Sequence, residues 1–150
     1  SVIDFSVLVS QRRGRKVMVL FTDGDDSTSR RGLEDAVRAL QGSEVTCYGV
    51  SYASRLAAFG SGSGAYKDLA REAQRSIETL ARGSGGFVVD GTSPDVVAQL
   101  KRIADDIGSL YVIGFAPAPS KKAEHRRLKV EVAGRDLTVR HREGYDARPR

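Results

Sequence analysis

The sequence predicts an α/β fold with a mostly parallel central sheet, followed by an antiparallel pair of strands near the C-terminal end. Continuous apolar runs, which are typical of strands buried on both faces, alternate with segments of helical periodicity. This strand–helix alternation occurs three times, as in a parallel sheet covered by helices. The pattern then changes to strict alternation of apolar and polar residues, which predicts the antiparallel pair.

Local signals place each element. Residues 1–10 are largely apolar without a clear period, so a short helix and a strand both fit. The clearest helix start combines Ser93 as N-cap, Pro94 at the first helical position and Asp95 in the first turn. Buried strands are predicted at 17–21, 45–51, 87–89 and 110–115, helices at 33–40, 66–81 and 93–107, and antiparallel strands at 127–132 and 137–141, joined by a turn at 133–136.

Length and composition fit one globular domain with an extension. The chain has 150 residues, of which 40% are hydrophobic and 29% charged. We expect residues 1–115 to form the α/β part and residues 116–150 to form a β-hairpin extension on or beside it. The apolar runs are too short to span a bilayer, so no membrane segment is expected. Cys47, the only cysteine, lies in such a run and is expected to be a small buried hydrophobe.

The excess of basic residues lies near the C-terminal end. Of 24 Lys plus Arg and 19 Asp plus Glu, the last 35 residues hold 10 and 5, which leaves 14 of each for residues 1–115. These charges alternate with apolar residues, as on the solvent face of a strand pair. A basic surface can attract nucleic acid, but this pattern carries no recognition motif, so we expect no nucleic-acid partner.

Candidate chemistry is concentrated in the loop after the first buried strand. Asp23 stands at the carboxyl end of that strand, and Asp25 and Asp26 follow within the same turn. Ligands bind at the carboxyl ends of the strands in open α/β sheets. Clustered carboxylate and hydroxyl oxygens suit a hard cation such as Mg²⁺ or Ca²⁺. The same residues also fit a plain turn whose hydroxyls cap a helix, and spacing alone leaves both interpretations open.

An EF-hand calcium loop matches this segment in part. Its ligand positions would be occupied by Asp23, Asp25, Ser27, Ser29 and Glu34. Thr28 stands where that loop requires glycine, and a strand precedes the segment where a helix should be. Both departures argue against a calcium loop.

An enzyme motif also matches. The apolar strand followed by Asp23-x-Asp25-x-Ser27 resembles the first motif of haloacid-dehalogenase-like phosphatases, which are magnesium-dependent. This resemblance would make Asp23 the nucleophile and Asp25 the acid/base. Such enzymes also need a strand-end hydroxyl, for which Ser51 could serve, and a carboxylate pair. The pair at 105–106 lies inside a predicted helix, so the phosphatase is the alternative interpretation.

A third resemblance extends over nearly the whole chain. Residues 15–26 look like the fourth strand and following loop of von Willebrand factor type A (VWA) domains, and residues 45–51 look like the next strand. Residues 80–88 are similar to the family's helix, paired glycines and following strand. Residues 111–115 and 140–145 resemble the end of bacterial relatives, notably von Willebrand-related proteins of Acidobacteria. The match corresponds to the C-terminal part of the VWA fold.

The resemblance implies a Rossmann-like three-layer sandwich that binds a protein or ligand without catalysis. Many such domains carry a metal-ion-dependent adhesion site built from three loops, and only Asp23 matches it, as the third-loop aspartate. The first-loop Asp-x-Ser-x-Ser has no counterpart ahead of Asp23, and the second-loop threonine would precede residues 1–4. With Asp25 and Asp26 as the other nearby carboxylates, we expect weak or no binding of Mg²⁺ or Ca²⁺ by this chain.

The resemblance also implies a protein partner. The family's first three strands would normally cover one side of strand 17–21, so in this chain that strand is expected to be an apolar sheet edge. Such edges recruit other strands, and we expect binding of a protein partner or self-association there. An extracytoplasmic location is suggested by the resemblance alone.

Overall fold

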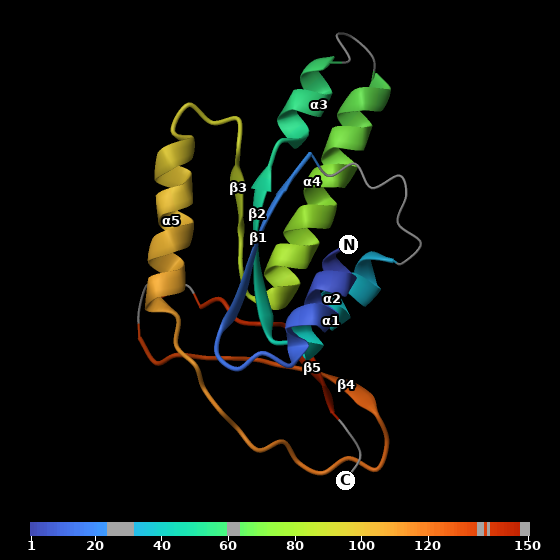
Figure 1. The fold of residues 1–150 in the computed structure, drawn as a ribbon, viewed down its shortest axis with the longest axis vertical. Coiled ribbons are helices and arrows are strands. Elements are labelled where there is room, and N and C mark those ends of the chain that lie inside the picture. Colours follow the sequence, from blue (N-terminus) through green and yellow to red (C-terminus); the bar gives the residue numbers. More distant parts are fainter. Residues whose placement is uncertain (24–31, 60–63, 135–136, 138, 148–150) are drawn as a thin grey trace.

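Three parallel strands form the central sheet. In the computed structural model, which describes residues 1–23, 32–59, 64–134, 137 and 139–147, they lie in the order β1-β2-β3 (Figure 1). Their bounds are Lys16–Thr22 for β1, Val45–Ser51 for β2 and Val88–Asp90 for β3. The predicted strands at 17–21, 45–51 and 87–89 are therefore confirmed, with small shifts at their ends. β2 is the central strand and is buried along almost its whole length.

Helices cover both faces of this sheet, which confirms the predicted α/β sandwich. In Figure 1, α5 lies on one side of the sheet and α1, α2 and α4 lie on the other. Their bounds are Val2–Ser10 for α1, Leu33–Gly42 for α2, Ala53–Phe59 for α3, Gly64–Ser84 for α4 and Val96–Ser109 for α5.

The alternation of side chains along β2 produces two cores. Val45 and Cys47 point toward α2 and α4 and pack with Leu40 and Leu80. Tyr48 and Val50 point the other way and pack with Val89 and Ile103, beneath α5. Strand β1 follows the same rule, because Met18 and Leu20 contact the first core whereas Val17 contacts the second. Val19 and Phe21, two and four residues after Val17, therefore lie on the α5 face.

Residues 1–10, for which sequence alone allowed two structures, form a helix. The Ser1 hydroxyl accepts a hydrogen bond from the Asp4 amide, and the Asp4 carboxylate accepts one from the Ser1 amine, which is a capping box. Two otherwise unsatisfied donors of the first turn are thereby paired. This local chemistry stabilises a helix where the apolar pattern is uninformative.

The middle of the chain differs from the prediction in two places. Helix α3 was not predicted, and its seven residues are too few to show a helical period. Helix α5 begins at Val96 and not at Pro94, because the Ser93 carbonyl accepts from the Val96 amide at 3.1 Å in a turn. The Ser93 hydroxyl accepts from the Asp95 amide at 3.2 Å, so this serine caps the turn and not the helix.

The strand predicted at 110–115 is also wrong. No described strand pairs with this segment. Its side chains are exposed, with Tyr111 at 93% and Val112 at 79% of their full accessible surface. A high β propensity is not sufficient, because a strand is stable only when a neighbour completes its hydrogen bonds.

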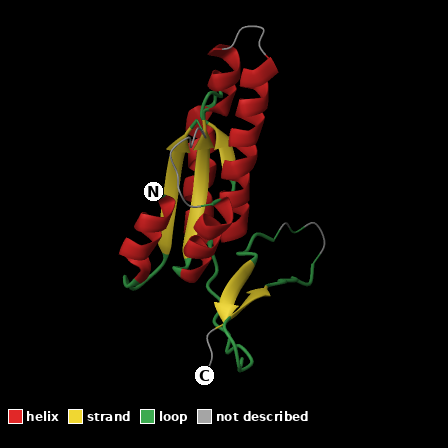
Figure 2. Cartoon of the chain, turned by 90° about the vertical axis from the view of Figure 1, so that its right-hand side faces the viewer, coloured by secondary structure: helices red, strands yellow, loops and turns green. Residues whose placement is uncertain are grey.

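The C-terminal antiparallel pair exists, but it involves other residues. β4 (Glu124–Arg127) pairs with β5 (Gly144–Ala147), with Arg127 opposite Gly144 (Figure 2). Apart from Arg127, the predicted strands at 127–132 and 137–141 lie between β4 and β5, and residues 135, 136 and 138 fall outside the described part of the chain. The paired strands begin before and end after the predicted hairpin, because the segment 139–143 contacts the helices and is not available for pairing. The Glu143 amide, for example, donates to the Gly83 carbonyl at 3.1 Å.

Candidate functional site

The carboxyl ends of the three parallel strands meet at one edge of the sheet. The Tyr52 amide, after β2, donates to the Thr22 carbonyl of β1 at 2.8 Å, and the Gly91 amide, after β3, donates to the Ser51 carbonyl at 2.8 Å. Asp23 directly follows β1 at this edge and is exposed. Asp25 and Asp26, the other two candidate residues, lie outside the described part of the chain.

The polar groups at this edge are engaged with one another. Asp90 accepts hydrogen bonds from both the amide and the hydroxyl of Thr92, at 2.8 and 2.7 Å. The Ser54 hydroxyl in turn lies 2.8 Å from that of Thr92. The Ser51 hydroxyl donates to Gln74 at 2.7 Å and accepts from the Ala53 amide at 3.3 Å. These bonds hold α3 and α4 against the strand ends.

A pocket of roughly 660 Å³ opens between these helices and β3. One wall carries cations that recur every fourth residue along α4, so that they share a face of that helix: Lys67, Arg71 and Arg75. Arg71 is paired with Asp68 at 2.8 Å on the same helix. Asp90 adds a carboxylate to the lining, so the pocket carries charges of both signs.

The described residues at this edge do not fit a hard-cation site. Mg²⁺ and Ca²⁺ need several oxygen ligands. Asp23 is the one candidate ligand of the loop that the structure describes, and Ser51 is already bonded to Gln74. Within the described ranges, no three His, Cys, Asp or Glu side chains gather closely enough to hold a metal.

The phosphatase geometry is met only in part. Ser51 ends the strand next to β1, as that enzyme family requires of its hydroxyl. Asp105 and Asp106 lie on α5 and not at a strand end. Asp105 is paired with Lys101 at 3.0 Å, and Asp106 accepts from the Tyr48 hydroxyl at 2.7 Å and is paired with Arg140. Both carboxylates therefore serve structural contacts.

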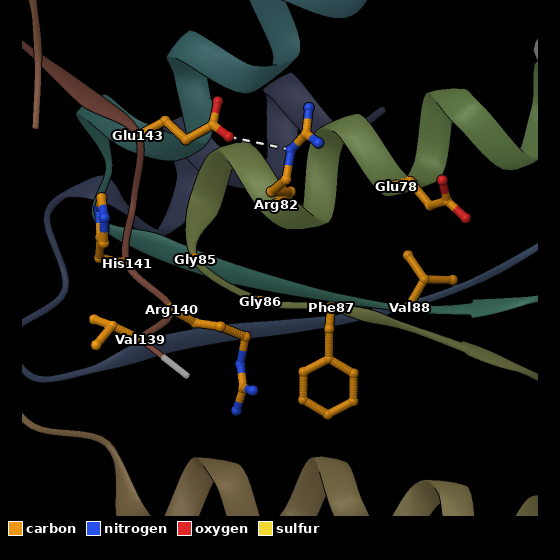
Figure 3. Close-up of a pocket in the computed structure, with 10 residues that line it drawn as sticks. All are labelled: Glu78, Arg82, Gly85, Gly86, Phe87, Val88, Val139, Arg140, His141 and Glu143. Atoms are coloured by element: carbon orange, nitrogen blue, oxygen red, sulfur yellow. Dashed lines mark ion pairs between the residues drawn. The ribbon is translucent and has the colours of Figure 1, made fainter. Parts of the chain in front are cut away.

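A second pocket, of roughly 580 Å³, lies beside β3 where the C-terminal segment crosses the α/β part (Figure 3). On one side Arg82 of α4 is paired with Glu143 at 3.1 Å. On the other side the Phe87 ring contacts two guanidinium groups, with Arg140 at 5.0 Å and Arg102 at 5.5 Å from its centroid. Sequence reasoning missed this pocket, because nothing local in residues 139–143 indicates that they meet α4 and β3.

The outer side of β1 is a third surface of interest. In the described part of the chain β1 pairs with β2 alone, in parallel. Because Thr22 directs its carbonyl toward β2 and backbone groups alternate sides along a strand, Val17, Val19 and Phe21 direct their amides and carbonyls outward. The side chains of Val19 and Phe21 are 38% and 56% exposed. Helix α5 therefore leaves the side chains of Val19 and Phe21 partly uncovered. They lie next to backbone groups of β1 that no described strand pairs with.

Comparisons with protein-family models, with curated proteins and with solved structures give no match. No helix of the described ranges is long and apolar enough to cross a membrane. Function is therefore inferred from the three surfaces above: the strand ends, the pocket beside β3 and the outer side of β1.

Proposed function

We propose that this chain is a non-enzymatic protein-binding module of the VWA type, which binds a strand of its partner along β1. Three of the stretches that resemble VWA domains fall on β1, on β2 and on the junction of α4 with β3, whereas the stretch at 111–115 is exposed and forms no strand. The parallel order β1-β2-β3 with helices on both faces agrees with the Rossmann-like sheet that the resemblance implies. An adhesion or interaction role follows from that resemblance.

The observation that carries the proposal is the open side of β1. Val17, Val19 and Phe21 offer backbone donors and acceptors in a row, beside apolar side chains that are partly exposed. Addition of a partner strand satisfies such a row, and pockets for alternate side chains give specificity. Proteins usually protect such edges with charged residues, proline or a covering segment. Between Val17 and Phe21 the edge carries no charged residue and no proline.

The arrangement of the strand ends also favours binding over catalysis. The hydroxyl of Ser51 and the carboxylate of Asp90 are held in hydrogen bonds that join α3 and α4 to the sheet. The carboxylate pair that a phosphatase would need is located on α5, where Asp106 contacts Tyr48. These contacts give the polar residues a structural role.

Strand addition is tested with a short fluorescent peptide of alternating valine and threonine, titrated against the chain at low concentration. We expect saturable binding that Val19→Lys weakens by at least about 10-fold, because a lysine on the edge opposes pairing. The matched control is Val97→Lys, which changes a valine that is 78% exposed on α5. Equal binding by both variants, or none by the unmodified chain, would contradict the proposal.

The second candidate is the magnesium-dependent phosphatase with Asp23 as nucleophile and Asp25 as acid/base. The observation that favours it is the position of Ser51 at the end of the strand beside β1. It is tested by p-nitrophenyl phosphate hydrolysis with Mg²⁺, compared between the chain and Asp23→Asn. We expect equal background rates. Turnover that Asp23→Asn abolishes would replace the binding module by the enzyme.

A further inference from the structure

We propose that the groove between α4 and β3 binds an extended acidic segment of a partner protein, in which acidic residues alternate with apolar ones. The α4–β3 groove is the pocket of roughly 660 Å³ that α3, α4 and β3 line at the strand ends. It lies at the opposite edge of the sheet from β1, so this inference goes beyond the proposed function. Three features lead to it: the cations of α4, the lining of the groove and the outer backbone groups of β3.

Cations on α4 give the groove its charge. Lys67, Arg71 and Arg75 line it at intervals of four residues. Within the described part of the chain Lys67 and Arg75 form no ion pair, whereas Arg71 is paired with Asp68 at 2.8 Å. Asp90, on the facing strand, is the one carboxylate among the described lining residues. Three cations against one carboxylate favour an anionic ligand.

The spacing of these cations matches an extended chain. Four residues of an α-helix rise about 6 Å, and two residues of a strand span about 6.6 Å. Acidic side chains at every second position of an extended segment would therefore meet Lys67, Arg71 and Arg75 in turn. From Lys67 to Arg75 the helix rises about 12 Å, which is close to the span of five extended residues. Glu78, which lines the adjoining pocket beside β3, ends the row of cations (Figure 3).

The rest of the lining leaves room for a main chain and for apolar side chains. It consists largely of small or apolar residues: Ala53, Ala57, Ala70, Val88 and Val89. On the other face of β3, Phe87 and Val89 pack into the core beneath α5. Because side chains alternate along a strand, the apolar residues between the acidic ones would face that core. A uniformly charged polymer such as nucleic acid has no such alternation, so a protein segment is the better match.

The backbone of β3 provides a position for an added strand. The Gly49 amide of β2 donates to the Phe87 carbonyl at 3.0 Å, and Gly49 lies opposite Val88 in the parallel pair. Phe87 and Val89 therefore bond to β2, and the amide and carbonyl of Val88 are directed outward, where no described strand pairs with them. The Val88 side chain lies on the same face of the sheet as Ile77 of α4, because a Cβ atom on Gly49 would contact both. A strand bonded to Val88 would thus present alternate side chains to α4.

Peptide binding tests the charge pattern. A short fluorescent peptide of alternating valine and glutamate is titrated against the chain at low salt, and fluorescence polarisation measures binding. We expect saturable binding that Arg75→Glu weakens by at least about 5-fold and Lys67→Glu/Arg75→Glu by at least about 20-fold, because each reversal replaces an attraction by a repulsion. The matched control is Arg38→Glu, which reverses an exposed arginine of α2 and is expected to keep the affinity within roughly 2-fold. Thermal melting checks that each variant is folded.

Two modified peptides test the extended form. A peptide of the same composition with its glutamates grouped together keeps the net charge but loses the alternation, and we expect it to bind at least about 5-fold more weakly. The alternating peptide with methylated backbone nitrogens cannot donate to the Val88 carbonyl. We expect a loss of at least about 5-fold here too, because strand addition depends on main-chain hydrogen bonds.

The outcomes separate this inference from the proposed function. No binding of the alternating acidic peptide, or equal losses in Arg75→Glu and Arg38→Glu, overturns the α4–β3 groove as its site. Equal binding of the grouped peptide overturns the extended form, and equal binding of the methylated peptide overturns the pairing with Val88. Val19→Lys is expected to leave acidic-peptide binding unchanged.

Two results would assign the groove or the peptide differently. If Val19→Lys abolishes binding of the acidic peptide and Arg75→Glu does not, the peptide binds along β1, so the groove proposal fails and the proposed function stands. If a single-stranded oligonucleotide binds in place of the peptide and Arg75→Glu weakens it, the groove is a nucleic-acid site and the proposal is overturned. Conversely, loss of acidic-peptide binding in Arg75→Glu, without any binding of the valine–threonine peptide, supports the groove and contradicts the proposed function.

Discussion

Cys47 behaves as a buried hydrophobe and not as a reactive thiol. It is fully buried in β2, and this burial raises the pKa of its thiol from an ordinary value near 9 to about 12. The thiolate is the reactive form, so the folded chain should not react with thiol reagents at neutral pH. This agrees with the role expected from its apolar surroundings in the sequence.

The raised pKa of Cys47 predicts how stability depends on pH. Between about pH 9 and pH 12 the unfolded chain has lost the thiol proton while the folded chain retains it. The contribution of the protonated Cys47 thiol to stability is therefore complete below pH 9. Between pH 9 and pH 12 the free energy of unfolding falls by roughly 1.4 kcal/mol per pH unit. Urea unfolding at pH 8, 9 and 10 measures this free energy, and we expect it to decline less steeply with pH in Cys47→Ala than in the unmodified chain. Parallel declines would contradict this assignment.

Asp106 satisfies a hydroxyl in the core beneath α5. Tyr48 is fully buried and donates to the Asp106 carboxylate at 2.7 Å, while burial and this carboxylate raise the pKa of Tyr48. Asp106→Ala leaves the buried hydroxyl without this acceptor and is expected to cost about 1–3 kcal/mol. Tyr48→Phe leaves Asp106 paired with Arg140 and should cost less. Urea unfolding of both variants measures the difference, and the reverse order would contradict it.

At the scale of the elements, the junction of α4 and β3 depends on a close backbone approach. A Cβ atom on Gly86 would lie 2.0 Å from the Cys47 carbonyl oxygen, so any larger residue must push β2 and β3 apart. Gly86→Ala is expected to destabilise the chain by at least about 2 kcal/mol, as overpacking against backbone does. Gly42, at the end of α2, has open space around it, and Gly42→Ala should be neutral or slightly stabilising. Thermal melting compares them, and equal effects would argue against the close approach.

The elements that were predicted correctly are those whose signal is local. β1 and β2 are continuous apolar runs, and α2 and α4 have strong helical periodicity along their 10 and 21 residues. The location of Asp23 at a strand end follows from the β1 signal in the same way. The pairing of β4 with β5 could not be predicted, because it depends on contacts such as that of Glu143 with Gly83. The exposed segment 110–115 shows the converse, a local strand signal that finds no partner.

At the scale of the whole molecule, arginines of the C-terminal region hold it against the α/β part. Arg140 is paired with Asp106 of α5, and Arg142 lies 3.3 Å from the Gln41 carbonyl and 3.8 Å from Glu44 beside α2. Two arginines of the basic excess near the C-terminal end, Arg140 and Arg142, thus have structural partners. The division into residues 1–115 and 116–150 remains a prediction, and these contacts favour an extension that packs on the α/β part.

Metal binding is the last property that belongs to the molecule as a whole, because a bound ion would stabilise the entire fold. A ligand at 100 times its dissociation constant adds about 2.7 kcal/mol. For a chain of this length, that corresponds to a rise of the melting midpoint by roughly 5–10 °C. Because only Asp23 matches the adhesion site that the VWA resemblance implies, we expect Mg²⁺, Mn²⁺ and Ca²⁺ to leave the midpoint of the chain unchanged, with Asp23→Ala as the control. A rise that Asp23→Ala abolishes would mean that the loop after β1 binds a cation by itself, and would favour the phosphatase over the binding module.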